Sequence, residues 1–170
     1  MLIAIPVVAA AAGLLAMASG SPHHAAPPRT MHAATAGPAP LAGRWSLDVA
    51  RIPAEERPRA VTMAFTVSPD RRWTTRVEIV APDGSAQHTE STAAADGVAV
   101  PVTGNMPGID TVSLRQPAPN TLVMTLGKGG VPVSTRVYAV ARDRRSMTET
   151  IVWAGQALPK LETTVFHRID

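Results

Sequence analysis

The chain contains no cysteine. This absence excludes disulfide bonds, thiolate nucleophiles, cysteine-ligated metals and a lipid-modified cysteine after a signal sequence. Once the N-terminal segments described below are set aside, about 130 residues remain, and a domain of this size buries roughly two-thirds of its unfolded surface. The chain is therefore long enough to fold around a hydrophobic core without a stabilising disulfide bond.

Aromatic residues and excess charge are also scarce. Aromatic residues make up 4% of the chain, and 16 Lys and Arg against 13 Asp and Glu give a formal net charge of +3. Nucleic-acid-binding proteins need a strongly basic face and usually aromatic stacking platforms, and no helix-turn-helix pattern is present. We therefore expect no nucleic-acid partner. The arginines that gather in short polar segments are expected at hairpin tips: Arg71, Arg72, Arg142, Arg144 and Arg145.

Residues 1–18 form an apolar, alanine-rich run that ends in the small residues Ala16 and Ala18. This pattern predicts a signal peptide cleaved after Ala18, although no Lys or Arg precedes the run. An uncleaved membrane anchor is the alternative, because the run reaches the short end of what spans a bilayer. Pro6 and Gly13 interrupt the run and favour cleavage. We expect a periplasmic or secreted protein that contacts a membrane only if the segment is retained.

Residues 19–40 are rich in Ala and Pro, with Arg29 as the only formal charge. Such a segment buries too little apolar surface to offset its ordering entropy, so we expect a disordered linker. It carries His23, His24 and His32, three of the five histidines. Their spacing matches no closed metal site and no carboxylate accompanies them, so neither a metal nor another cofactor is expected.

From residue 41 onward the sequence alternates apolar and polar residues, as in Val61–Val67 and Trp73–Ile79. Turn signals such as Pro82-Asp83-Gly84 and Gly127-Lys128-Gly129-Gly130 separate the alternating runs. This pattern predicts nine or ten half-buried strands, with one helical turn at residues 53–57. We expect an all-β domain over 41–170, folded as an antiparallel up-and-down β-barrel.

The tripeptide Gly43-Arg44-Trp45 opens the first expected strand, and a series of up-and-down strands follows it. This combination resembles the calycin barrels, the superfamily of lipocalins and fatty-acid-binding proteins. Most of residues 41–170 is similar to a group of small secreted bacterial lipocalin-like proteins without an assigned biochemical role. The chain departs from lipocalins in having no Thr-Asp-Tyr motif, C-terminal helix or cysteine pair. The similar segments are 41–48 (LAGRWSLD), 101–105 (PVTGN), 110–114 (DTVSL), 120–121 (NT) and 128–130 (KGG).

The resemblance implies a specific structural contact at one end of the barrel. In the family, the tryptophan of the Gly-x-Trp motif is covered by an arginine from near the end of the barrel. Arg168, in the last expected strand, is the corresponding candidate here. We therefore expect Arg168 to stack on Trp45 and Gly43 to permit a close approach of the backbone.

The sequence offers no catalytic constellation. The strand region contains only His88 and His167 as histidine bases, and there is no Gly-x-Ser-x-Gly nucleophile elbow. The acidic pair Glu55-Glu56 lies in a polar segment and indicates a solvated surface rather than paired catalytic carboxylates. We therefore expect a protein that is not an enzyme.

Two functions remain open from the sequence. A barrel of eight or more strands either holds one small ligand or fills its interior with side chains. The first case predicts a binding protein for a small apolar molecule, and the second predicts an envelope protein that binds a protein partner through a strand edge or loops. The residues expected to line a ligand site are Met63, Phe65, Val77, Ile79, Leu114, Met124, Leu126, Val137, Ile151 and Trp153.

Overall fold

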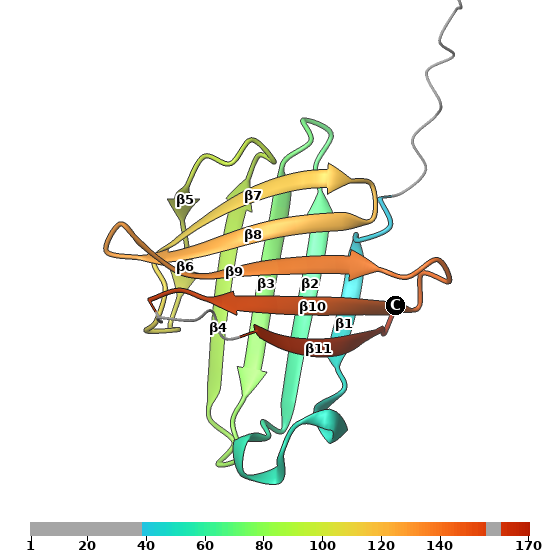
Figure 1. Ribbon diagram of the computed structural model, residues 1–170, viewed down its shortest axis with the longest axis vertical. Coiled ribbons are helices and arrows are strands. Elements are labelled where there is room, and N and C mark those ends of the chain that lie inside the picture. The colour runs from blue at the N-terminus through green and yellow to red at the C-terminus, as the bar shows by residue number, and fades with distance from the viewer. Residues whose placement is uncertain (1–38, 156–160) are drawn as a thin grey trace, which may run out of the picture. The chain divides into compact units, whose positions relative to one another are not determined.

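The structure is a computed structural model that describes residues 39–155 and 161–170 (Figure 1). The expected signal peptide, and all but the last two residues of the expected linker, lie outside the described residues. The elements in chain order are β1 (Gly43–Leu47), η1 (Val49–Arg51), η2 (Ala54–Glu56), β2 (Ala60–Val67), β3 (Trp73–Val80), β4 (Ala86–Ala93), β5 (Val100–Pro101), β6 (Thr103–Gly104), β7 (Thr111–Ala118), β8 (Thr121–Lys128), β9 (Val131–Val140), β10 (Ser146–Trp153) and β11 (Leu161–Arg168).

The expected fold class is confirmed. The described strands form one antiparallel, nearly closed barrel of 11 strands, slightly more than the nine or ten expected. The difference comes from β5 and β6, which have 2 residues each and are too short to leave a period-two pattern. The expected helical turn is also present, as the 3-10 helix η2.

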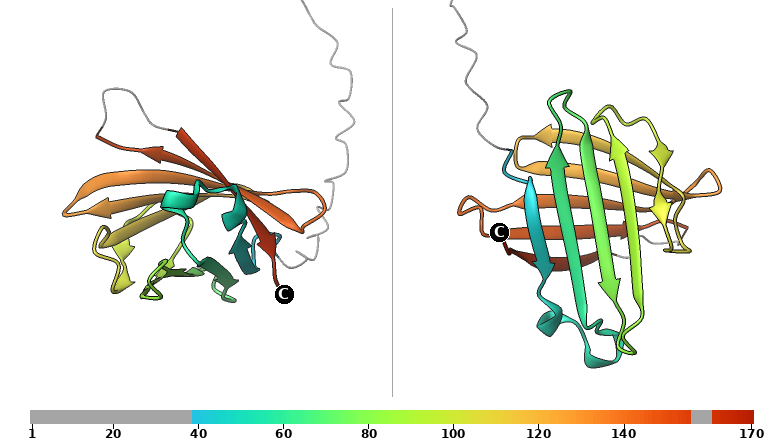
Figure 2. Two further views of the ribbon diagram at one scale, coloured as in Figure 1. Left: turned by 90° about the horizontal axis from the view of Figure 1, so that it is seen from below. Right: turned by 180° about the vertical axis from the view of Figure 1, so that it is seen from behind.

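Neighbouring strands in the barrel are nearly all neighbours in the chain. The sheet order is β5-β7-β8-β9-β10-β11-β1-β2-β3-β4-β6, and β11 closes onto β1 with Trp45 opposite Arg168. Strands β1–β4 run across strands β7–β10 as two facing layers (Figures 1 and 2). This up-and-down order follows from the short turns, because a tight hairpin places consecutive strands side by side.

One seam, between β4 and β7, is not closed by a continuous ladder. The chain between these strands covers it: β6 pairs with β4, β5 pairs with β7, and the Gly97 N–H donates to the Leu114 carbonyl at 2.8 Å. The side chain of Asn105 extends this cover by forming hydrogen bonds with the β4 backbone. Its side-chain oxygen accepts from the His88 N–H at 2.7 Å, and its side-chain nitrogen donates to the Ala86 carbonyl at 3.1 Å. Part of the β4 edge is therefore blocked against another strand.

One half of the barrel is filled with side chains. Phe65 lies at its centre, with its ring edge-on to Trp73 at 6.3 Å and to Tyr138 at 5.4 Å between centroids. Both geometries are favourable aromatic pairs. The large side chains buried in this half include Trp45, Phe65, Trp73, Leu114, Leu122, Val140 and Met147.

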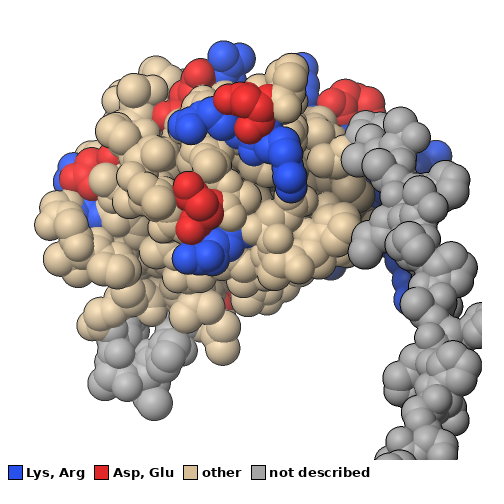
Figure 3. Space-filling view, turned by 90° about the horizontal axis from the view of Figure 1, so that it is seen from above, with Lys and Arg blue, Asp and Glu red and all other residues tan. Residues whose placement is uncertain are grey.

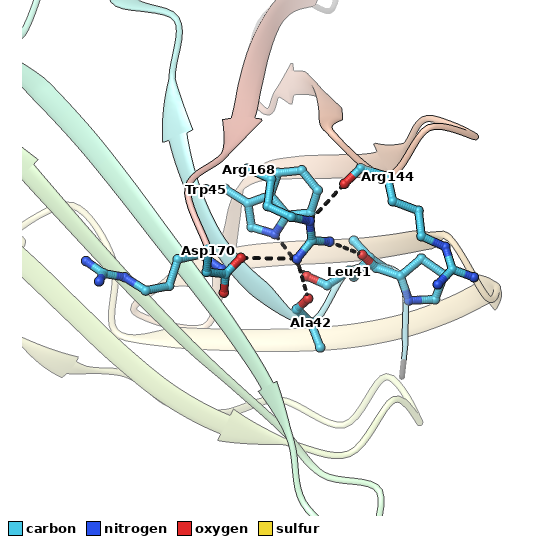
Figure 4. A network of polar contacts seen from close by, with 8 residues as sticks. Leu41, Ala42, Trp45, Arg144, Arg168 and Asp170 are labelled. Carbon is cyan, nitrogen blue, oxygen red and sulfur yellow. Dashed lines mark hydrogen bonds and ion pairs between the residues drawn. The ribbon is translucent and has the colours of Figure 1, made fainter. Parts of the chain in front are cut away.

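The end of the filled half is closed by Arg168 over Trp45 (Figure 4). The guanidinium carbon lies 4.2 Å from the centroid of the fully buried Trp45 ring. Arg168 also donates to the carbonyls of Ala42 at 2.8 Å, Pro40 at 2.6 Å and Arg144 at 2.8 Å. The expected contact between Trp45 and Arg168 is thus confirmed, and it joins the first and last strands.

Gly43 makes this closure sterically feasible. Its φ of +133° lies in a region that L side chains rarely adopt, and a Cβ there would overlap the Nη1 atom of Arg168. Glycine tolerates both conditions because it has no Cβ. The close approach expected at this position is therefore present.

Candidate ligand-binding cavity

The other half of the barrel is hollow. A cavity of about 340 Å³ lies between the two layers, which is near the lower end of the range for small-molecule sites. Most of its wall is aliphatic, and strands β1, β2, β3, β7, β8 and β10 all contribute aliphatic side chains to it. The lining residues are Leu47, Ile52, Glu56, Pro58, Val61, Met63, Thr75, Val77, Ile79, Thr89, Ser91, Val102, Met106, Ile109, Val112, Met124, Leu126, Arg136, Tyr138, Glu149, Ile151, Thr164 and Phe166.

Two connecting segments contribute to the lining. The first, between β1 and β2, supplies Ile52, Glu56 and Pro58. Arg57 secures this segment by donating from Nη2 and Nε to the Ile52 carbonyl at 2.7 and 3.0 Å. The second segment, between β4 and β7, supplies Val102, Met106 and Ile109. Because Glu56 is exposed, the first segment places part of the lining at the protein surface.

Of the ten residues expected to line a ligand site, the structure brings six to the cavity: Met63, Val77, Ile79, Met124, Leu126 and Ile151. Phe65 and Leu114 instead pack in the filled half. Trp153 is half-buried beside the cavity, with the Arg136 guanidinium 5.9 Å from its ring centroid.

Val137, which the sequence pattern places inside the barrel, lies on the outward face of β9. Its neighbours Arg136 and Tyr138 both line the cavity, and successive side chains of a strand point to opposite faces. Val137 therefore points away from the interior.

A polar cluster, consisting of Arg136, Tyr138, Glu149 and Thr164, interrupts the apolar wall. The strand register assembles it, because Glu149 on β10 lies directly opposite Tyr138 on β9 and Thr164 on β11. Glu149 Oε1 accepts hydrogen bonds from Arg136 Nη1 at 2.8 Å and from the Tyr138 hydroxyl at 2.9 Å. Glu149 Oε2 accepts from the Thr164 hydroxyl at 2.9 Å. Arg136 and Glu149 thus form an ion pair in which the Glu149 side chain is only 4% exposed.

Several buried polar atoms near this cluster lack a partner. Among the described residues, Thr75 Oγ1, Ser134 Oγ and Arg136 Nε are buried without a hydrogen bond. Thr75 lies on β3 and also lines the cavity, so polar groups contribute from both layers. Unsatisfied buried polar atoms are uncommon and costly in native proteins. Because Thr75 and Arg136 both line the cavity, their unpartnered atoms favour a ligand with a polar group.

The cluster alters the proton affinity of its own members. Burial raises the pKa of Tyr138 well above its usual value, and the adjacent Glu149 carboxylate raises it further. Burial by itself lowers the pKa of Arg136, but the interactions of its guanidinium with Tyr138 and Glu149 outweigh this effect and raise the pKa. Arg136 therefore stays cationic and Tyr138 keeps its proton in the folded protein.

We expect Tyr138 to ionise only when the protein unfolds. A raised pKa in the folded state means that the contribution of Tyr138 to stability is complete below about pH 10, its unfolded pKa, and is lost as the pH rises further. Tyr138 is the only tyrosine of the chain, so tyrosinate absorbance reports this residue alone. In an alkaline titration, tyrosinate absorbance should increase over the same pH range in which the β-sheet circular dichroism signal is lost. Ionisation well before unfolding would contradict the buried cluster.

The sequence did not single out Arg136, Tyr138, Glu149 or Thr164. A usable signal was present at Glu149, which occupies an inward position between Met147 and Ile151 on the same face of β10. A carboxylate in an otherwise apolar face is expensive unless it is paired. A carboxylate on the apolar face of β10 therefore indicates a candidate site at Glu149, although the sequence pattern alone does not identify the cation that pairs with it.

The two histidines weighed in the sequence, His88 and His167, do not line the cavity. His88 is exposed on β4, and His167 is an exposed residue of β11 with Nε2 3.5 Å from Asp48 Oδ2. In the described ranges 39–155 and 161–170, no group of His, Asp and Glu has metal-site geometry. Figure 3 shows cationic and anionic side chains interspersed on the face that it presents. That face is therefore not a patch of one sign.

The fold and the cavity define a nearly closed, antiparallel β-barrel that is compatible with a calycin-like fold. No model of a known protein family matches the chain, and no curated protein is significantly similar to it in sequence. Among the described residues, no helix has the length and apolar character needed to cross a membrane.

Proposed function

We propose that this chain is a noncatalytic, lipocalin-like barrel, exported to the periplasm or beyond, that binds one small and largely apolar molecule. The observation that carries this proposal is the cavity of about 340 Å³ with a mainly aliphatic wall. Small-molecule sites are typically concave and apolar, with a few polar groups that orient the ligand. The resemblance of the Gly43-Arg44-Trp45 segment to lipocalin-like proteins supports the barrel fold on which this function depends.

The contrast between the filled half and the hollow half of the barrel also supports binding of a small ligand. The filled half contains Trp45, Phe65 and Trp73, whereas most of the residues that line the hollow half are aliphatic. An empty cavity of this size is costly because its walls lose contacts and hydrophobic stabilisation. A ligand that occupies it recovers part of that loss, since anything that binds only the folded state stabilises it.

The apolar wall is sufficient for useful affinity. Removing apolar surface from water contributes about 25 cal/mol per Å². After the costs of association, burial of a small lipid-like molecule is enough for binding in the micromolar range. Met63, Met106 and Met124 give the wall side chains that adapt to ligands of different shape.

Two methionines provide a matched test of the cavity. Met124 lines the cavity, whereas Met147 is fully buried in the filled half. We expect Met124→Trp to fold, because the cavity absorbs the larger ring, and to lose binding of the neutral fluorescent probe Nile red. Met147→Trp should be destabilised by about 1–3 kcal/mol, because a packed interior has no room for added volume. Probe titration and chemical denaturation measure the two effects.

The outcomes separate the proposal from its alternative. If the wild-type protein takes up neither the probe nor any lipid, the proposed function is wrong. If both tryptophan variants are equally destabilised, the hollow half is packed in solution and a partner-binding role becomes the better account. That role has less support at the strand edges, because Asn105 and β6 cover part of β4.

A further inference from the structure

We propose that the Arg136–Glu149 ion pair receives the hydroxyl head of a neutral amphiphile and that Glu149 excludes anionic lipids. This inference rests on the proposed function, because it assigns the polar end of the same cavity. It concerns the class of ligand: a long-chain alcohol or similar uncharged molecule, rather than a fatty acid.

The Arg136–Glu149 pair is energetically costly in its apolar surroundings. Burial of an ion pair loses hydration of both charges, and well-packed hydrophobic residues in the same place are often equally stable or more stable. Aliphatic residues such as Met124 and Ile151 already adjoin Arg136 in the barrel, each directly opposite it on a neighbouring strand. Stability alone therefore gives little reason for a charged pair at this position, whereas recognition of a polar head group does.

Both members of the pair retain hydrogen-bonding capacity for a ligand. A carboxylate accepts about four hydrogen bonds, and Glu149 receives bonds from Arg136, Tyr138 and Thr164. Oε2 accepts from Thr164, which leaves this oxygen able to accept from a ligand. Arg136 carries more N–H donors than its Nη1 bond to Glu149 uses. A hydroxyl both donates and accepts, so one group satisfies both sides of the pair.

The charge balance of the pair favours a neutral head group over an anionic one. Arg136 and Glu149 compensate each other, so the pair presents no net charge to a ligand. A carboxylate head placed beside it loses hydration and finds no uncompensated cation to offset that loss, because Arg136 is already paired with Glu149. A neutral head has a smaller desolvation cost. Thr75 adds a buried, unpartnered hydroxyl to the same cavity from the facing layer, which also favours an uncharged polar group.

The experiment changes the charge of the pair and follows the head-group preference. Nile red displacement compares decanol with decanoate for the wild-type protein, Glu149→Gln and Glu90→Gln. Glu90 is the matched control, because it pairs with Arg76 at 2.6 Å on the outer surface. We expect the wild type to bind decanol, and Glu149→Gln to bind decanoate at least about tenfold more tightly than the wild type does. Glu90→Gln should behave as the wild type.

The results distinguish failure of the proposed function from failure of this inference alone. If the wild type binds neither the probe nor decanol, the proposed function fails and this inference fails with it. If the wild type binds decanol but decanoate affinity is the same in wild type and Glu149→Gln, the cavity binds ligands and the inference alone is overturned. Decanoate should also raise the melting temperature of Glu149→Gln, because it supplies the missing negative charge.

A second variant keeps the test decisive if Glu149→Gln does not fold. The double variant Arg136→Leu with Glu149→Leu removes both charges together, a change that folded proteins often tolerate. We expect it to retain Nile red binding and to bind decanol about tenfold more weakly than the wild type, because the hydroxyl loses its partners. Equal or tighter decanol binding by the double variant would show that the head group lies elsewhere.

Discussion

Replacing Trp45 by alanine is expected to destabilise the protein by about 3–5 kcal/mol, the range found for removing a large buried aromatic side chain. The Trp45 side chain is fully buried, its indole N–H donates to the Leu41 carbonyl at 2.9 Å, and Arg168 stacks on its ring. Truncation therefore leaves a void, removes a hydrogen bond and removes the ring on which Arg168 rests. A loss of this size is a large share of the stability of an ordinary domain.

Trp153 provides the matched control. It is half-buried rather than fully buried, so Trp153→Ala removes less packed surface and should cost clearly less than Trp45→Ala. Urea denaturation of both variants measures the difference from the midpoint and slope. Equal losses at the two positions would contradict the role of Trp45 in closing the filled end of the barrel.

Replacing Arg136 by alanine is expected to cost about 3–5 kcal/mol, because removal of one partner leaves a buried charge uncompensated. Glu149 would keep its bonds from Tyr138 and Thr164 but lose its cation. The matched control is Arg76→Ala, which breaks the exposed pair with Glu90 and should cost about 0–1 kcal/mol. Denaturation at neutral pH compares the two variants.

The double variant Arg136→Leu with Glu149→Leu extends this comparison. If the loss in Arg136→Ala comes from the unpaired charge of Glu149, removing both charges should restore much of the stability. A double variant as unstable as Arg136→Ala would assign the loss to packing of the arginine stem instead. The same double variant serves the ligand test, so stability and head-group recognition are measured on one protein.

The strands were predictable because each long strand has one face inside the barrel. Strand β8 illustrates this: Leu122, Met124 and Leu126 are buried, and polar or smaller residues lie between them. Tight-turn residues placed consecutive strands side by side, which is enough to predict an up-and-down sheet. The pairing of Trp45 with Arg168 was predictable only through a resemblance, since no local pattern joins residues at opposite ends of the domain.

Strand β9 shows where the pattern failed. Val131, Val133 and Val137 occupy one phase of the strand, and Tyr138 and Val140 occupy the other, so apolar residues lie on both faces. The structure buries the phase that contains Ser134, Tyr138 and Val140 and brings Arg136 to the cavity. The register with β8 and β10 decides between the phases, because a slip of one residue exchanges the two faces of a strand.

The strands, their order and most of their inward faces could be predicted from the amino-acid sequence, because they depend on a period of two and on turn residues close in the chain. Which half of the barrel is filled and which half is hollow depends on the packing of the folded chain. The folded chain also brings Arg136, Tyr138, Glu149 and Thr164 together. Both outcomes depend on how strands distant in sequence align and on how side-chain volumes fill the space between two layers, and neither quantity is encoded in a local pattern.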